Sequence, residues 1–220
     1  MDSRQYRERL YPLQDRVLQR IGGLDTGFYL TGGTAASRGY LDHRYSDDLD
    51  LFVNDDARFG LWSARVIQGL AGDRSLRVEV QVKDERFTRL VVLEEDLPLK
   101  VELVNDVPSR VGVPTRHPVL GLLDTAENIL ANKVSALVDR NEPKDLADLW
   151  GFSCRMGLPL RAAIRDATGK AAGVFEPDLA RVLCSVTRDD WEAVRWTVPP
   201  PYERYREDLV SLGELLVLEG

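Results

Sequence analysis

The chain has very few of the residues on which disulfide, redox and soft-metal chemistry depend. Its 220 residues include two cysteines, Cys154 and Cys184, and two histidines, His43 and His117. The cysteine spacing matches no metal or redox motif, and we expect two buried thiols in a reducing compartment. Two histidines cannot form a multi-histidine metal site, so any metal ion must be held by oxygen ligands.

Long hydrophobic runs and an excess of positive charge are also missing. No run approaches the ~20 residues of a membrane-spanning helix, so we expect no membrane association. The first ten residues are polar and charged, unlike a secretory signal, and we expect a cytoplasmic protein. With 29 basic and 36 acidic side chains, the net charge of −7 excludes a strongly basic nucleic-acid-binding coat. The net charge does not exclude a locally basic groove that binds nucleic acid.

Hydrophobic periodicity divides the chain into two halves. In residues 1–118, helical spacing predicts helices over 3–22, 34–41 and 57–71, and short or alternating apolar runs predict strands at 28–30 and 49–53. Three further runs, 76–82, 87–93 and 98–104, predict consecutive antiparallel strands. Residues 119–220 read as helices only, over 124–140, 143–156, 159–168, 176–186, 188–196 and 202–218. Asp124 and Glu127 have the spacing of a capping box for the first of these. We therefore place a domain boundary after residue 118, between an α/β half and an all-helical half.

A glycine turn and a pair of aspartates form the first candidate site. Gly32 and Gly33 follow a short buried strand and precede a helix, so their backbone N–H groups can approach a triphosphate closely, and Thr34 adds a hydroxyl. Asp48 and Asp50 lie on one face of the next strand because side chains alternate along a strand. Two adjacent carboxylates repel each other unless a cation lies between them, and Mg²⁺ prefers carboxylate and phosphate oxygens.

Glu102 is a candidate third carboxylate. In the strand 98–104, Lys100 and Glu102 share one face while Val101 and Leu103 share the other. Glu102 could bind a metal or accept a proton. An exposed strand face with alternating lysine and glutamate is an equally ordinary arrangement.

Two blocks of sequence resemble a known family. The first is Gly32-Gly33-Thr34-Ala35 followed by residues 43–52, HRYSDDLDLF; the second joins residues 133–140, KVSALVDR, to residues 144–149, KDLADL. These two blocks and their order along the chain resemble those of the nucleotidyltransferases of the polymerase-beta-like superfamily. Within that superfamily they are most similar to the AbiEii-type (MenT-like) toxins. The resemblance implies an α+β fold, with a nucleotidyltransferase domain on a mixed sheet followed by an all-helical domain.

By this resemblance, the enzyme would transfer a nucleoside monophosphate from an NTP to an acceptor hydroxyl and release pyrophosphate. The expected cofactor is Mg²⁺, held by Asp48, Asp50 and Glu102, and the expected catalytic residues are Asp48, Asp50, Lys133 and Asp145. The expected NTP-binding residues are Gly32, Gly33, Thr34, Arg44 and Ser46. Lys133 could also simply pair with Asp145 across a helix hairpin, and Asp148, one turn later, could replace Asp145.

The expected acceptor is RNA, at the 3′ end of tRNA, and the expected partner is a cognate antitoxin that acts by binding or by modifying Ser46. Transfer to a small molecule such as an aminoglycoside, or to a protein, is the alternative. A groove of arginines would favour RNA, because phosphate contacts dominate RNA affinity; the candidates are Arg38, Arg44, Arg116 and Arg140. An acidic pocket would favour a cationic small molecule.

Overall fold

The computed structural model describes residues 2–169 and 175–218 and divides the chain into two compact units. Unit 1 consists of Met1–Ala35, Tyr45–Pro108 and Val113–Asp124. Unit 2 consists of Ala36–Arg44, Ser109–Gly112 and Thr125–Gly220. The division thus differs from a single boundary after residue 118, because the helical unit also takes two short segments that precede it in the sequence.

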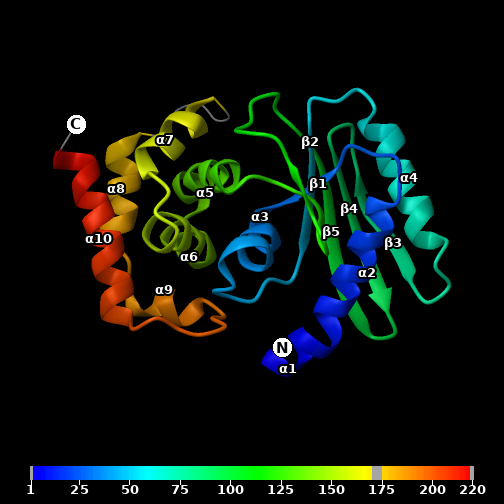
Figure 1. The fold of residues 1–220 in the computed structure, drawn as a ribbon, viewed down its shortest axis with the longest axis horizontal. Helices are drawn as coiled ribbons and strands as arrows, with labels where there is room; N and C mark the ends of the chain where they lie inside the picture. The colour runs from blue at the N-terminus through cyan, green and yellow to red at the C-terminus, as the bar shows by residue number, and fades with distance from the viewer. Residues whose placement is uncertain (1, 170–174, 219–220) are drawn as a thin grey trace. The chain divides into compact units, whose positions relative to one another are not determined.

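Unit 1 is built on a seven-stranded mixed sheet with the order β3-β4-β5-β2-β1-β7-β6 (Figure 1). The strands are β1 (Tyr29–Thr31), β2 (Leu49–Asn54), β3 (Arg77–Lys83), β4 (Phe87–Glu94), β5 (Leu97–Asp106), β6 (Thr115–His117) and β7 (Gly121–Leu123). The pairs β2–β5 and β1–β7 are parallel, and the others are antiparallel. The expected antiparallel run β3-β4-β5 is confirmed. The expectation of helices only beyond residue 120 is wrong at β7, since a three-residue strand is too short to show an alternating pattern.

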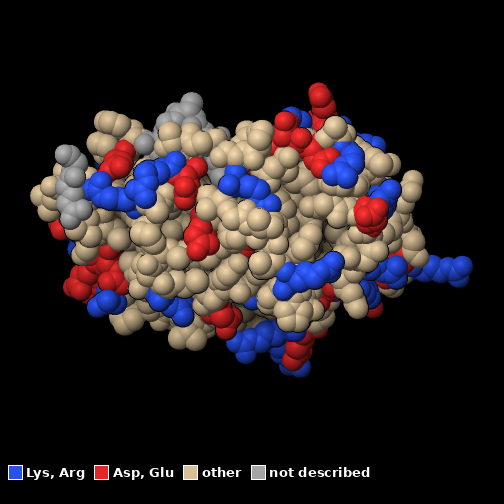
Figure 2. Space-filling view, turned by 45° about the horizontal axis from the view of Figure 1, so that its top comes forward, with Lys and Arg blue, Asp and Glu red and all other residues tan. Residues whose placement is uncertain are grey.

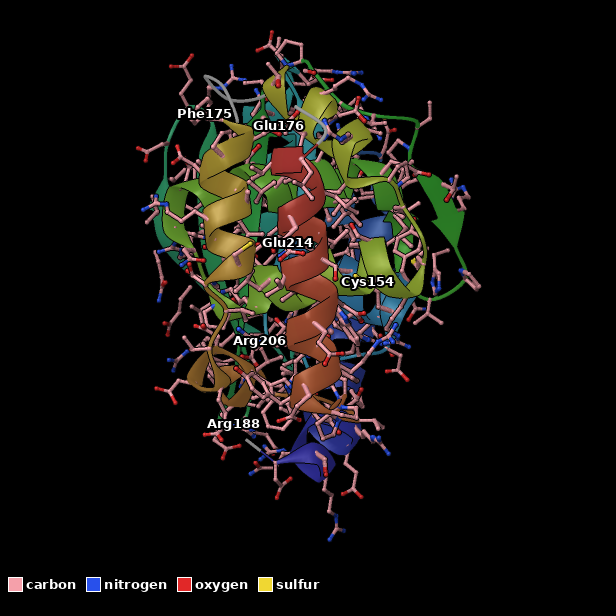
Figure 3. The ribbon with its side chains drawn as sticks, turned by 90° about the vertical axis from the view of Figure 1, so that its left-hand side faces the viewer. Cys154, Phe175, Glu176, Arg188, Arg206 and Glu214 are labelled. Atoms are coloured by element: carbon pink, nitrogen blue, oxygen red, sulfur yellow. The ribbon has the colours of Figure 1, made fainter. Side chains whose placement is uncertain are left out.

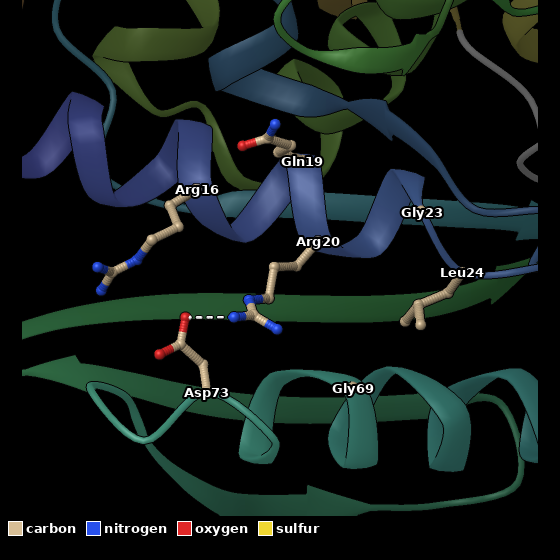
Figure 4. Close-up of a pocket in the computed structure, with 7 residues that line it drawn as sticks. All are labelled: Arg16, Gln19, Arg20, Gly23, Leu24, Gly69 and Asp73. Atoms are coloured by element: carbon tan, nitrogen blue, oxygen red, sulfur yellow. Dashed lines mark ion pairs between the residues drawn. The ribbon is translucent and has the colours of Figure 1, made fainter.

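The helical segments of unit 1 are α1 (Ser3–Gln5), η1 (Tyr6–Leu10), α2 (Tyr11–Gly22), α3 (Gly32–Thr34) and α4 (Phe59–Ala71), while η2 (Ala35–Leu41) leads into unit 2. The longer helices, α2 and α4, cover the apolar face of this sheet and lie side by side (Figures 1 and 4). Val17 of α2 and Val66 of α4 are fully buried, as are Leu51 of β2 and Leu103 of β5. The alternate residues of β2 and β5 are half-buried and carry the charged groups of the other face.

Unit 2 is a helical assembly around α5. Its elements are α5 (Ala126–Arg140), α6 (Pro143–Trp150), η3 (Gly151–Arg155), α7 (Leu160–Thr168), α8 (Glu176–Cys184), α9 (Arg188–Ala193) and α10 (Tyr202–Leu218). Helix α5 contacts α6, α7 and α8. Helix α10 lies beside α8 (Figure 3). A Cβ at Gly213 of α10 would lie 2.7 Å from Sγ of Cys184, so glycine permits this close approach.

Several local expectations are corrected. Both cysteines are free, but Cys154 is half-buried and Cys184 is exposed, so they are not two buried thiols. The cap of α5 is Thr125, whose Oγ1 accepts a hydrogen bond from the Asn128 N–H at 3.2 Å. Asp124 instead accepts a hydrogen bond from the Thr31 hydroxyl at 2.7 Å, which removes it from the predicted capping box. None of the described helices combines the length and the hydrophobicity needed to span a membrane.

Candidate active site

The charged face of the unit 1 sheet collects residues from three neighbouring strands. The parallel register places Asp50 of β2 opposite Glu102 of β5, and the antiparallel register places Glu102 opposite Arg89 of β4. Residues paired in register project to the same face of a sheet. Asp50 and Glu102 therefore lie on one face, opposite the buried Leu49, Leu51 and Val53. Asp48 precedes β2, which begins at Leu49, so the strand alternation expected to place it on the face of Asp50 does not extend to it.

A lysine supplies positive charge to this face. Nζ of Lys100 lies 2.9 Å from Oδ2 of Asp48 and 3.4 Å from Oε1 of Glu102. Partial burial lowers the pKa of Lys100, but Asp48, Glu102 and Asp50 raise it by more, so the net shift is upward. The ammonium is therefore held in its charged form between carboxylates.

The predicted glycine turn lies directly against one of these carboxylates. Gly32 has φ +65°, in the left-handed region that favours glycine. A Cβ at this position would overlap the carboxylate of Asp50. Gly32 and Gly33 are half-buried, so the turn remains partly accessible beside Asp50.

Buried hydroxyls connect the turn to the segment that leads into β2. Thr34 is fully buried, and its hydroxyl donates to the backbone carbonyl of Asp48. The hydroxyls of Thr34 and Ser46 are 2.9 Å apart. Nε2 of Gln14, from α2, donates to the carbonyls of Ser46 and Asp47, both at 3.1 Å. Thr34 and Ser46 thus position the turn relative to β2; their predicted contact with an NTP stays a prediction.

Glu102, the predicted third metal ligand, already forms ion pairs with Arg89 and Lys100. Nε and Nη2 of Arg89 lie 2.8 Å and 2.7 Å from Oε1 of Glu102, the oxygen that Lys100 also approaches. Among residues 2–169 and 175–218, no three His, Cys, Asp or Glu side chains form a group able to hold a metal ion. Metal binding by Glu102 would therefore require it to exchange these cations for the ion.

A second charged cluster lies within unit 2, around Lys133 of α5. Lys133 is only 5% exposed, and its Nζ lies 2.7 Å from Oδ1 of Asp145 and 2.6 Å from Oδ2 of Asp148. Asp145 also pairs with Arg140 at 2.9 Å. The pairing across the α5–α6 hairpin, one of the two alternatives considered from sequence, is present. The ammonium is charged, since Asp148 and Asp145 raise the pKa of Lys133 although burial lowers it.

Asp148 is the centre of this cluster. Nε and Nη2 of Arg44 each lie 2.7 Å from one of its oxygens, and Nε2 of His43 lies 3.0 Å from Oδ1. Burial alone would raise the pKa of Asp148, but Arg44 and Lys133 hold it well below its ordinary value. Burial lowers the pKa of His43, against the opposing effect of Asp148, so the imidazole is neutral near pH 7.

The structure thus groups the predicted residues into two sets. Unit 1 brings together Gly32, Gly33, Thr34, Ser46, Asp48, Asp50 and Glu102, and unit 2 brings together Arg44, Lys133 and Asp145. Arg44, an expected NTP-binding residue and a candidate for an RNA groove, is 4% exposed and paired with Asp148. Sequence reasoning missed the contacts of Gln14 and Lys100. A polar residue on the apolar side of the first helix was the only available signal for Gln14.

A separate hollow lies between α2 and α4 in unit 1 (Figure 4). It is lined by Arg16, Gln19, Arg20, Gly23, Leu24, Gly69 and Asp73. Nη2 of Arg20 lies 2.9 Å from Oδ2 of Asp73, and Arg16 pairs with Glu94 at 2.5 Å. These ion pairs neutralise both arginines, and the hollow contains none of the predicted site residues.

Comparison with known proteins places this geometry in a family. A family model described as "Nucleotidyl transferase AbiEii toxin, Type IV TA system" matches residues 16–198. None of the curated proteins matches the sequence.

Solved structures share the fold at low sequence identity. MenT4, a nucleotidyltransferase toxin from Mycobacterium tuberculosis H37Rv, has a TM-score of 0.68 and 20% identity over 95% of this chain and 83% of its own. JHP933 from Helicobacter pylori has a TM-score of 0.65 and 20% identity, over 98% of this chain and 93% of its own. A putative nucleotidyltransferase from H. pylori has a TM-score of 0.62 and 19% identity, over 93% of each chain. Because the family model spans most of the chain, including Asp48, Asp50 and Lys133, the protein belongs to the AbiEii family of nucleotidyltransferase toxins of type IV toxin–antitoxin systems.

Proposed function

We propose that this nucleotidyltransferase uses Mg²⁺ to transfer a nucleoside monophosphate from an NTP to the 3′ end of a tRNA. Family membership already implies a nucleotide substrate and an antitoxin partner. The observation that carries the proposal is the placement of Asp50 against the Gly32 turn, on the sheet face that also holds Glu102. This arrangement puts metal-binding oxygens beside a backbone segment suited to phosphate.

The donor set fits a divalent cation. Asp48 and Asp50 offer the carboxylate oxygens that Mg²⁺ prefers, and Asp48 already carries the ammonium of Lys100 as a cationic partner. A Mg²⁺ ion held by Asp48 and Asp50 would neutralise triphosphate charge and help to align the reacting phosphate. Phosphoryl-type transfer depends mainly on such alignment and charge neutralisation, with little covalent participation by the protein.

The residues of unit 1 then have distinct roles. The Gly32-Gly33 turn would contact the triphosphate through backbone N–H groups. The acceptor oxygen forms a bond to the α-phosphorus while the bond from that phosphorus to the bridging oxygen breaks, and pyrophosphate leaves. The hydroxyl proton passes to solvent or to a carboxylate of this face, for which Glu102 is the candidate.

We also propose catalytic roles for Lys133 and Asp145 of unit 2. Support comes from the second sequence block that resembles the family, and from the charged state of Lys133. A buried ammonium is a compact point charge suited to a phosphate oxygen. Arg44 is proposed to act with this pair, through Asp148, in keeping the cluster ordered.

The choice of RNA as acceptor rests on the family resemblance and on the distribution of charge. Figure 2 shows basic and acidic side chains interspersed with uncharged surface on the face displayed. Of the four arginines considered for an RNA groove, Arg44 is buried and Arg140 pairs with Asp145. An RNA contact would therefore be confined and would use other arginines, Arg38 and Arg116 among them.

One labelling experiment tests the acceptor. The protein is incubated with Mg²⁺ and each α-³²P-labelled NTP, with total tRNA, with tRNA lacking its 3′-terminal nucleotides, or with an aminoglycoside. We expect label in intact tRNA only, and none with Asp48→Ala. Label in the aminoglycoside or in the protein itself would favour the alternative acceptors, and label in no acceptor with any NTP would overturn the proposal.

A further inference from the structure

We propose that Lys100 is a resident counter-ion of the carboxylate face, and that its ammonium must leave Asp48 before a divalent cation can bind there. The protein without nucleotide would then hold Mg²⁺ weakly, and metal and nucleotide would bind together. This inference rests on the proposed role of Asp48 and Asp50 as metal ligands.

The contacts of Lys100 place it at the proposed metal-binding oxygens. Its Nζ lies 2.9 Å from Oδ2 of Asp48 and 3.4 Å from Oε1 of Glu102. Lys100 comes from β5, two residues before Glu102, and therefore projects to the same face. One ammonium thus bridges two of the three carboxylates that this face presents.

The two cations of this face differ in what they contact. Arg89 binds Glu102 through Nε and Nη2, whereas Lys100 binds Asp48 as well. An ammonium and a metal ion on the same carboxylate oxygens would be like charges a few ångströms apart, and they repel. Binding of a divalent ion by Asp48 therefore competes with Lys100 and not with Arg89.

The side chain of Lys100 is able to move away. It is 38% exposed, and four rotatable carbon–carbon bonds connect its ammonium to β5. A triphosphate entering beside the Gly32 turn would offer new anionic partners to the displaced ammonium and new oxygen ligands to the metal ion. The metal ion and the nucleotide would then each strengthen binding of the other, since coupling between two sites is reciprocal.

The test is a Mn²⁺ titration of the full chain without nucleotide, in which free Mn²⁺ is measured by its electron paramagnetic resonance signal. Wild type, Lys100→Met and Lys100→Gln are compared with Lys83→Met, which removes the same charge from an exposed position of β3. We expect the Mn²⁺ dissociation constant to fall at least about tenfold in both Lys100 variants, because one direct charge competition is removed. The control should stay within about twofold of wild type, as an exposed, distant charge is screened.

Variants of Asp48 distinguish a failure of the counter-ion inference from a failure of the proposed metal site. Asp48→Asn added to Lys100→Met should abolish the gained affinity. If the dissociation constants of both Lys100 variants equal that of wild type while Asp48→Asn removes binding, the metal site stands and the counter-ion inference is overturned. If Asp48→Asn leaves Mn²⁺ binding unchanged in every background, both the metal site and the inference fail. Thermal unfolding by circular dichroism confirms that each variant is folded.

Discussion

A Cβ atom at Gly32 would lie 2.9 Å from Cγ of Asp50 and closer still to its Oδ2. The turn and the carboxylate therefore approach each other to a distance that only glycine allows, and the backbone at Gly32 also has the positive φ that glycine favours. This contact fixes where a phosphate on the turn would lie relative to Asp50.

Gly32→Ala should damage both stability and catalysis. Strain at the positive φ and overlap with Asp50 should lower the free energy of unfolding by about 1–3 kcal/mol. Displacement of the turn should lower turnover at least about a hundredfold, because transfer depends on alignment. Urea unfolding and labelled-NTP incorporation measure the two effects. Gly22→Ala is the matched control, since a Cβ there meets nothing within 4 Å, and full activity in Gly32→Ala would contradict the account.

Gln14 should act as a positioning residue for β2. Gln14→Leu leaves the buried carbonyls of Ser46 and Asp47 without their donor, which should cost about 1–3 kcal/mol of stability. The same change loosens the segment that leads into Asp48, so we expect a lower kcat even in fully folded protein. Gln19→Leu, on the exposed side of the same helix, should change neither quantity. Equal kcat values for Gln14→Leu and Gln19→Leu would show that catalysis does not depend on the positioning of β2 by Gln14.

Lys133→Met should unfold more easily as well as lose activity. Its side chain is buried and its ammonium pairs with both Asp145 and Asp148. Loss of one partner from a buried ion cluster should cost about 3–5 kcal/mol. Lys144→Met should cost less than about 1 kcal/mol, because Lys144 is half-exposed and its pair with Glu142 lies at the surface.

Chemical denaturation compares the two lysine variants, and turnover is measured at a temperature where both are folded. Wild-type turnover in folded Lys133→Met would leave Lys133 with a structural role only and would remove it from the proposed catalytic set.

His43 should make stability fall at mildly acidic pH. Its pKa is lowered by burial, and Arg44 and Arg155 add to this while Asp148 opposes it. Above the ordinary histidine pKa of about 6.5, His43 is neutral in both states and contributes no pH dependence. As pH falls below that value, the unfolded chain takes up a proton that the folded protein resists, so the free energy of unfolding decreases. Urea midpoints between pH 7 and pH 5 should fall more steeply in wild type than in His43→Gln; identical slopes would contradict this assignment.

The sheet and its aspartates could be predicted because their signals are local. Alternation along residues 49–53 fixes which side chains share a face, and the glycine pair marks the turn that precedes a helix. The long helices were likewise visible from their periodicity, and α10 has the predicted bounds, 202–218.

The contacts that order the charged clusters could not be predicted, because they join distant parts of the chain. Arg44 and Asp148 are separated by 104 positions, and nothing in either neighbourhood indicates that they pair. The partners of Glu102 depend on strand register, which side-chain alternation alone does not determine. Thr125 rather than Asp124 caps α5, because the hydroxyl of Thr31 binds Asp124.

The central claim is that the aspartates beside the Gly32 turn form the nucleotidyl-transfer centre. Its most direct test is the rate of pyrophosphate release with tRNA and NTP in wild type, Asp50→Asn and Asp25→Asn, where Asp25 is an exposed aspartate of the same unit. We predict that Asp50→Asn keeps the wild-type circular dichroism spectrum but releases pyrophosphate at least about a hundredfold more slowly, while Asp25→Asn is unaffected. Release by folded Asp50→Asn within about threefold of the wild-type rate would contradict the account.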